Sequence, residues 1–178
     1  EKNDPKIKKL LEEVKDREFI GYSYDGADAS FELLARRLIG EIPRYILINE
    51  YDVSVKKDSL GEIISHAKAQ LEVDGKKILC EGQGNGPVNA LDNAIRKNVN
   101  KLAKYSEYLK DLKLVDYKVR ILNTGTEAIT RVSIESTDSK GKNWFTIGVS
   151  ANIIDASFKA LVDSLDYKLF KDNAPASL

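Results

Sequence analysis

The sequence predicts an α+β fold in which a helical linker hairpin precedes two pseudo-symmetric βββα units, each forming a sheet with a helix. Three observations predict it. Apolar residues recur with the helical period over the first forty residues, the pattern then changes to the alternation typical of strands, and the order of three strands and one helix occurs twice. A length of 178 residues suits one large domain or two small ones.

The first segment predicts two helices. Pro5 fits the first turn of a helix that follows Asp4, and apolar residues return behind it at helical spacing. The break Gly21–Gly26 separates this helix from a second one, which stops at Gly40–Pro43. We therefore expect a helical linker subdomain over residues 1–42 and a second domain over residues 43–178, built from repeats at 43–106 and 112–172.

The first repeat begins with Tyr45–Val55, whose aromatic and β-branched residues predict a strand. Alternation over Ala67–Val73 predicts a second strand, Asp74-Gly75 a hairpin turn, and Lys76–Glu81 a third strand. The amphipathic pattern of Pro87–Lys104 predicts the helix that closes the repeat.

The second repeat has the same order. Its strands are expected at Leu112–Asn123, Glu127–Asp138 and Asn143–Ser150, and its helix at Ile153–Phe170. Because the order is repeated, we expect two halves with a similar core.

The residues of the two repeats correspond at a constant offset. Gly82 aligns with Gly148 at 66 residues (148 minus 82), and the first strands and the helices align at the same offset. The middle strands align less well, which predicts a one-residue slip or a bulge there.

Composition argues against several classes of function. The 28 Lys+Arg residues balance 28 Asp+Glu residues, so a basic nucleic-acid-binding face is not expected. His66 and Cys80 are the only residues of their types, too few for a structural zinc site or an internal disulfide, and we expect an ordinary histidine and a small core cysteine. No apolar run approaches the ~20 residues of a membrane span, and no signal peptide is recognisable, so a cytoplasmic protein is expected.

The most conspicuous local motif is the glycine-rich segment Gly82–Pro87. It lacks the ending of a phosphate-binding loop and the spacing of a dinucleotide fingerprint. Two interpretations remain. Gly84, Asn85 and Gly86 can expose N–H groups at a helix start that hold an anion such as a carboxylate, or the glycines merely allow a tight turn before the helix.

Chemistry alone predicts a binding or assembly module. The sequence shows no nucleophilic triad, metal cluster or convergent pair of carboxylates. The start at Glu1 without Met predicts a segment of a longer protein.

Several motifs together resemble a known family. They are Gly84–Ala90, Leu114–Val119 and Gly148–Ser157. They are similar to the C-terminal regulatory (allosteric and dimerisation) domain of the 2-isopropylmalate synthase and citramalate synthase family. Gly21–Leu34 resembles the linker subdomain of the citramalate synthase branch, and the resemblance covers nearly the whole chain.

The resemblance implies a parent enzyme that condenses acetyl-CoA with a 2-oxo acid, pyruvate for citramalate synthase, on a barrel that holds a divalent metal. That barrel is not in this sequence, so the chain alone is expected to be inactive and to hold no cofactor. The remaining part would form a homodimer and bind the end-product amino acid, isoleucine in the citramalate branch or leucine in the isopropylmalate branch. A dimerisation module without effector control, or an unrelated module whose glycine loop holds another anion, are the alternatives.

The resemblance also implies an effector site between the two repeats near the dimer interface. Its residues would be Val88, Leu114, Tyr117, Ile121 and Ala128, with Asn152 and Ile154 nearby. Leu114 and Tyr117 are an odd number of residues apart and would face opposite sides of a regular strand, so we expect a bulge or a twist between them.

Charged groups of the effector need partners as well. The turn Ser150–Ile154 is expected to supply N–H donors for the α-carboxylate, and Asp155 is a candidate for the α-ammonium. We further expect the helical hairpin to be less firmly ordered than the repeats, since linkers of the family pack against the catalytic domain.

Overall fold

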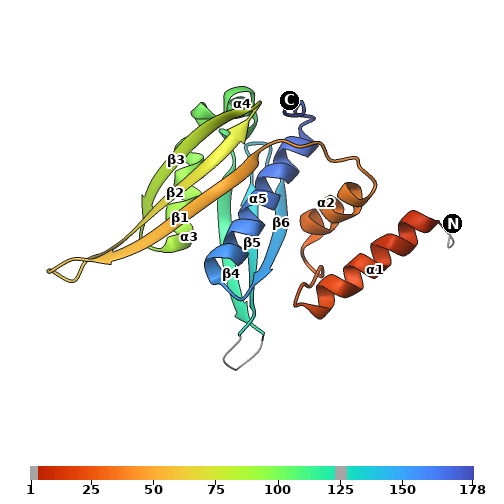
Figure 1. Ribbon diagram of the computed structural model, residues 1–178, viewed down its shortest axis with the longest axis horizontal. Helices are drawn as coiled ribbons and strands as arrows, with labels where there is room; N and C mark the ends of the chain where they lie inside the picture. The colour runs from red at the N-terminus through yellow and green to blue at the C-terminus, as the bar shows by residue number, and fades with distance from the viewer. Residues whose placement is uncertain (1–3, 123–127) are drawn as a thin grey trace. The chain divides into compact units, whose positions relative to one another are not determined.

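The computed structural model describes residues 4–122 and 128–178 (Figure 1). It confirms the α+β class, with two three-stranded antiparallel sheets and an N-terminal helical part. The chain forms two compact units, the first comprising Glu1–Pro43 with Lys113–Tyr167, the second Arg44–Leu112 with Lys168–Leu178. The expected strand ends at Asn123 and Glu127 lie outside the described residues.

Two helices open the first unit. Helix α1 (Pro5–Phe19) begins at Asp4, whose carboxylate accepts from the Lys6 amide at 2.8 Å, and α1 has no buried residue. Helix α2 (Asp28–Leu38) buries one side, including Leu33 and Leu34, and packs against strand β6. The two helices expected from the sequence are therefore present, and they differ strongly in burial.

The sheet of the first unit consists of β4 (Lys113–Ile121), β5 (Thr130–Thr137) and β6 (Asn143–Ser150) in that order. Helix α5 (Ile153–Lys171) runs along one face of it (Figure 1). A Cβ at Gly148 would overlap the backbone of Ala156, so the glycine lets strand and helix approach closely.

The second unit repeats this plan with β1 (Leu47–Lys57), β2 (Ile63–Val73), β3 (Lys76–Gly84) and helix α3 (Pro87–Arg96). Ala67, Ala69, Leu71 and Val73 of β2 are buried, and α3 packs on this sheet. A Cβ at Gly82 would overlap the backbone of Ala94, as at the equivalent glycine of the first unit.

The helix expected over Pro87–Lys104 is shorter than predicted. It ends at Arg96, and 3₁₀ turns at Val99–Lys101 and Ala103–Tyr105 lead into the short helix α4 (Ser106–Leu109). The amide of Asn98 donates to the carbonyls of Ala94, at 2.7 Å, and Glu81, at 3.0 Å. A side chain that satisfies the last carbonyls of a helix favours its end at that point.

The duplication is visible in the strand pairing. The β1–β2 register shifts between Ile48 and Glu50, and the β4–β5 register shifts at the equivalent place, between Leu114 and Asp116. Gln70 pairs with Glu50 and Glu135 with Asp116, so the middle strands correspond at 65 residues (135 minus 70) instead of 66. The predicted one-residue slip is confirmed.

No helix among the described residues has both the length and the apolar character required to cross a membrane.

Candidate functional site

The predicted effector residues of β4 share one face of their sheet. Leu114 pairs with Ser136, Tyr117 with Ile134 and Ile121 with Thr130. These three partners alternate along β5 and are all buried. Directly paired residues lie on the same face, so the register shift after Leu114 places all three β4 side chains on the side that α5 covers. The bulge expected from their odd spacing is confirmed.

This face of β4 is only partly covered. Leu114 and Tyr117 are half-buried, whereas Ile121 is 66% exposed. Val119 lies between Tyr117 and Ile121 on the same face and is 37% exposed. Val119 was missed by the sequence analysis, although its alternation with Tyr117 and Ile121 was a signal for it. The strand therefore presents an apolar strip to solvent.

Tyr117 connects this strip to the first turn of α5. Its hydroxyl lies 3.0 Å from the Ser157 Oγ, and the Ser157 hydroxyl donates to the Ile153 carbonyl at 2.6 Å. Since a hydroxyl has one hydrogen, Tyr117 is the donor to Ser157. The phenol ring is thereby fixed between strand and helix, which is the kind of pre-arrangement that a binding surface requires.

The start of α5 already has an internal cap. Asn152 Oδ1 accepts from the amides of Ile154, at 2.8 Å, and Asp155, at 3.3 Å. The carboxylate of Asp155 pairs with Lys159 at 2.8 Å. The Ile154 amide, which belongs to the turn expected to bind an effector carboxylate, is thus occupied by Asn152, as is the amide of Asp155, and the Asp155 carboxylate has a cationic partner.

The start of α3 has no such cap. Gly86 occupies the N-cap position in an extended conformation, and no side chain accepts from the first turn. The Asn85 amide donates to Asn89 Oδ1 at 3.3 Å, and Gly84 lies against Asn89 and Ala90.

The remaining predicted residues are separated along the fold. Val88, half-buried in the first turn of α3, belongs to the second unit, whereas the other predicted effector contacts belong to the first. Ala128 is half-buried in the connection that precedes β5. Val88 and the predicted residues of β4 therefore belong to different units.

A polar cluster in the first unit was not expected from the sequence. The guanidinium of Arg37 on α2 donates to Asp163 and to Asp166 on α5, both at 2.8 Å. The Ser30 hydroxyl donates to Asp163 at 2.9 Å and accepts from the Ile147 amide of β6, also at 2.9 Å. Burial raises the pKa of Asp166 to about 6. This cluster joins α2 to the helix that carries the Ser157–Tyr117 contact.

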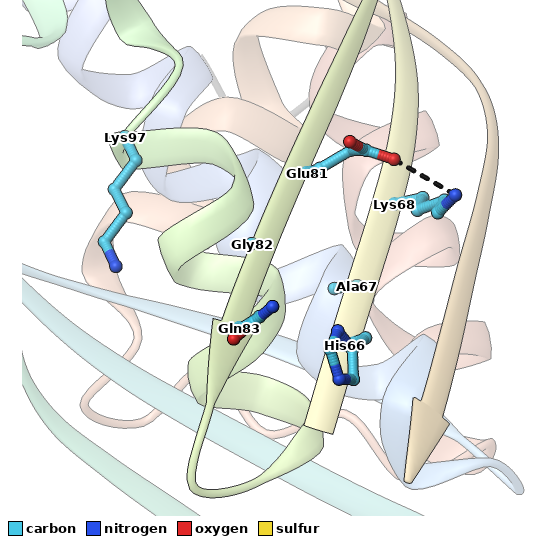
Figure 2. A pocket seen from close by; sticks show the side chains of 7 residues that line it. All are labelled: His66, Ala67, Lys68, Glu81, Gly82, Gln83 and Lys97. Atoms are coloured by element: carbon cyan, nitrogen blue, oxygen red, sulfur yellow. Dashed lines mark ion pairs between the residues drawn. The ribbon is translucent and has the colours of Figure 1, made fainter. Parts of the chain in front are cut away.

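An open hollow of about 350 Å³ lies along β3 in the second unit (Figure 2). It is lined by His66, Ala67, Lys68, Glu81, Gly82, Gln83 and Lys97, and Lys68 pairs with Glu81 at 3.1 Å. Apart from Ala67 and Gly82 its lining is polar, and none of the predicted effector residues lies in it. His66 is half-buried and Cys80 fully buried, as predicted for both, and burial raises the pKa of the Cys80 thiol.

Within the described ranges, no group of three or more His, Cys, Asp or Glu side chains is placed to hold a metal ion.

Two repeated sheet-and-helix units with exposed apolar strand faces define a domain for binding or assembly. Residues 25–169 match the family described as the LeuA allosteric (dimerisation) domain, and the chain belongs to this family. The resemblance inferred from the sequence is confirmed.

Individual relatives point to the citramalate branch. The chain is 44% identical to (R)-citramalate synthase of Geobacter sulfurreducens and 46% identical to that of Aquifex aeolicus, in each case over 94% of this chain and 32% of the relative. It is 39% identical to 2-isopropylmalate synthase of Clostridium acetobutylicum over 58% of this chain and 17% of the relative. The chain spans about a third of the length of the citramalate synthases.

Proposed function

We propose that this chain is the regulatory and dimerisation part of an acetyl-CoA-dependent acyltransferase of the citramalate synthase type, and that it binds isoleucine for feedback inhibition. The relatives named above support the class of enzyme. The observation that carries the effector site is the bulge in β4, which gathers Leu114, Tyr117 and Ile121 on one partly open face beside the start of α5.

The apolar strip suits a branched aliphatic side chain. Val119 and Ile121 expose surface that a ligand would remove from water, and burial of such surface contributes roughly 25 cal/mol per Å². Tyr117 supplies both ring surface and a fixed hydroxyl. An aliphatic pocket with a few fixed polar groups is the usual composition of a small-molecule site.

The α-carboxylate is placed at the first turn of α5. It replaces Asn152 Oδ1 as the acceptor of the Ile154 and Asp155 amides, where the helix dipole favours negative charge. The α-ammonium is placed near Asp155, whose carboxylate already attracts the cation of Lys159.

The inhibitory signal has a physical connection within the first unit. Ser157, near the start of α5, contacts Tyr117, and Asp163 and Asp166 further along α5 hold Arg37 of α2. Occupation of the β4 face would bias the position of α5 and thereby that of the linker helix. By linkage, a change in the linker must alter effector affinity by the same factor.

The homodimer is placed on the open apolar strip of the second unit, which the effector proposal does not use. There Val55 of the edge strand β1 is 55% exposed and Ile63 of the central strand β2 is 56% exposed, and the register places both on the same face of the sheet. A second copy that covers such strips removes apolar surface from water, and a two-fold interface uses the same patch on both chains.

Calorimetric titration with isoleucine, leucine and valine tests the effector proposal. Tyr117→Ala should weaken isoleucine binding more than tenfold, since losing one well-placed apolar contact costs about 1–3 kcal/mol. Tyr117→Phe, which keeps the ring, should weaken it less. Sedimentation should show an intact dimer for both variants.

Each outcome assigns a different function. Tighter binding of leucine would move the chain to the isopropylmalate type of regulation. A dimer that binds none of the three amino acids would leave a dimerisation module without effector control. Unchanged affinity of the Tyr117→Ala variant would remove the β4 face from the proposal.

A further inference from the structure

Two arginines of the first unit lie directly opposite each other on neighbouring strands. Arg120 of β4 pairs with Arg131 of β5 in the antiparallel register, and the two strands run side by side in Figure 1. Their neighbours Val119 and Val132 lie on the α5 side, so both guanidinium groups project from the opposite face. Cβ atoms of such pairs are about 5 Å apart, and like charges placed there repel each other.

The other arginines show how unusual this placement is for the chain. Of the seven arginines, Arg17, Arg36, Arg37 and Arg96 each pair with at least one carboxylate, whereas the exposed Arg44 lies outside the helices and strands and has no carboxylate partner among the described residues. Neither Arg120 nor Arg131 has a carboxylate partner among the residues that the structure describes. The overall charge is balanced, so the repulsion at this pair does not follow from an excess of basic residues.

Arg131 is also held in place. Its Nε donates to the Gly21 carbonyl in the α1–α2 connection at 2.7 Å, which leaves both Nη groups for another acceptor. Gly21 itself fits closely against Leu122, Ile129 and Val149. Burial, and secondarily the charge of Arg120, lower the pKa of Arg131, as expected for a cation whose charge is not compensated.

The surrounding charges do not neutralise the pair. On the same face, Lys118 is the next β4 side chain, and it pairs with Asp116 at 3.0 Å. Lys118 and Asp116 thus balance each other. Glu135 shares this face, but it lies opposite Asp116, four residues along β5 from Arg131, and its carboxylate accepts from the Asn143 amide at 2.6 Å. Among the described residues, no ion pair therefore joins Arg120 or Arg131 to a carboxylate.

We propose that Arg120 and Arg131 form a binding site for a phosphate dianion, either inorganic phosphate or the phosphate monoester of a small molecule. Two guanidinium groups match the two charges of a phosphate, and their planar N–H pairs bind its oxygens in a bidentate manner. The ligand bridges the two strands and, through Arg131, also the connection between α1 and α2.

The site is independent of the effector proposal, because it lies on the opposite face of the sheet from Tyr117. It predicts that phosphate fixes Arg131 and the Gly21 carbonyl together. Binding should therefore raise the melting temperature and slow amide exchange next to Gly21.

Thermal unfolding and calorimetry of the full chain test the site. Phosphate should raise the melting temperature of the parent more than potassium chloride of equal ionic strength, which controls for general screening. Arg120→Gln and Arg131→Gln should each lose most of this increase and weaken phosphate binding at least tenfold, a loss of about 1.4 kcal/mol. Arg36→Gln is the matched control, because its partners Glu32 and Glu41 belong to its own helix and the loop that follows, and it should bind phosphate like the parent.

The exposed Arg120 keeps the test decisive, since its substitution breaks no hydrogen bond that the structure assigns. Equal effects of phosphate and chloride on the parent, or an Arg120→Gln variant that binds phosphate like the parent, would overturn the proposal. Acetate that binds as tightly as phosphate would overturn the assignment of a dianion.

Discussion

Replacing Asp166 by Asn should stabilise the protein at neutral pH, although it removes one carboxylate from an ion pair. The single guanidinium of Arg37 faces two carboxylates, Asp163 and Asp166, so this cluster has one negative charge in excess. Burial, opposed by Arg37 and assisted by Asp163, raises the pKa of Asp166 from 3.8 to about 6. A difference of about 2 units favours the neutral form in the folded protein by about 3 kcal/mol.

The sign of the pH dependence follows from proton binding. The folded pKa of Asp166 lies above the unfolded one, so the folded state binds more protons between the two values. The free energy of unfolding therefore falls as the pH rises from about 4 to about 6, and above that range the ionised carboxylate costs up to about 3 kcal/mol. Asn is neutral at every pH, and its amide oxygen can still accept from Arg37. Asp166→Asn should thus gain stability at about pH 7 and gain little at about pH 4.

Urea unfolding at several pH values between about 4 and 8 measures this difference. Asp163→Asn is the matched control. Asp163 accepts from both Ser30 and Arg37, so its loss should destabilise the protein by about 1–3 kcal/mol. A variant Asp166→Asn that is less stable than the parent at neutral pH, or that keeps the parent's pH dependence, would refute the reasoning.

Two predictions concern packing. Gly82→Ala and Gly148→Ala should each destabilise the fold by more than about 2 kcal/mol in chemical unfolding, because their Cβ atoms would overlap helix backbone. Gly86→Ala, with open space around it, should have little effect. Equal effects of all three substitutions would contradict the close approach of strand and helix. Hydrogen exchange should be fast throughout α1, which has no buried residue, and slow in α2 around Leu33. Similar protection of both helices would contradict this difference in burial.

Much of the repeated core could be predicted from the sequence, because it depends on local patterns. Alternation and glycine spacing located both sheets, and the odd separation of Leu114 and Tyr117 required a bulge that the β4–β5 register contains. The poor alignment of the middle strands required a slip, and the paired strands are displaced by one residue. These features follow from the period of the strand and from the offset between repeats.

The features that sequence analysis missed depend on contacts over long separations. Arg37 meets Asp163 and Asp166 across 126 and 129 residues, and no local pattern marks those partners. For the same reason, the burial of α2 against β6 could not be separated from the exposure of α1, since both helices have an apolar stripe. The end of α3 at Arg96 depends on Asn98, whose amide bridges the helix and the neighbouring strand.

The two repeats differ most usefully at the residue before each helix, where Gly86 corresponds to Asn152 at the offset of 66 (152 minus 86). Gly86 offers no acceptor, whereas Asn152 satisfies two amides of α5. A carboxylate that takes the place of Asn152 exchanges one acceptor for another, so the helix start is satisfied both with and without a ligand. Such an exchange favours reversible binding, because a donor left unpaired and away from water in either state would cost about 1–3 kcal/mol. The cap that Asn152 forms at the start of α5, beside the apolar strip of β4, is therefore compatible with the proposed reversible effector site.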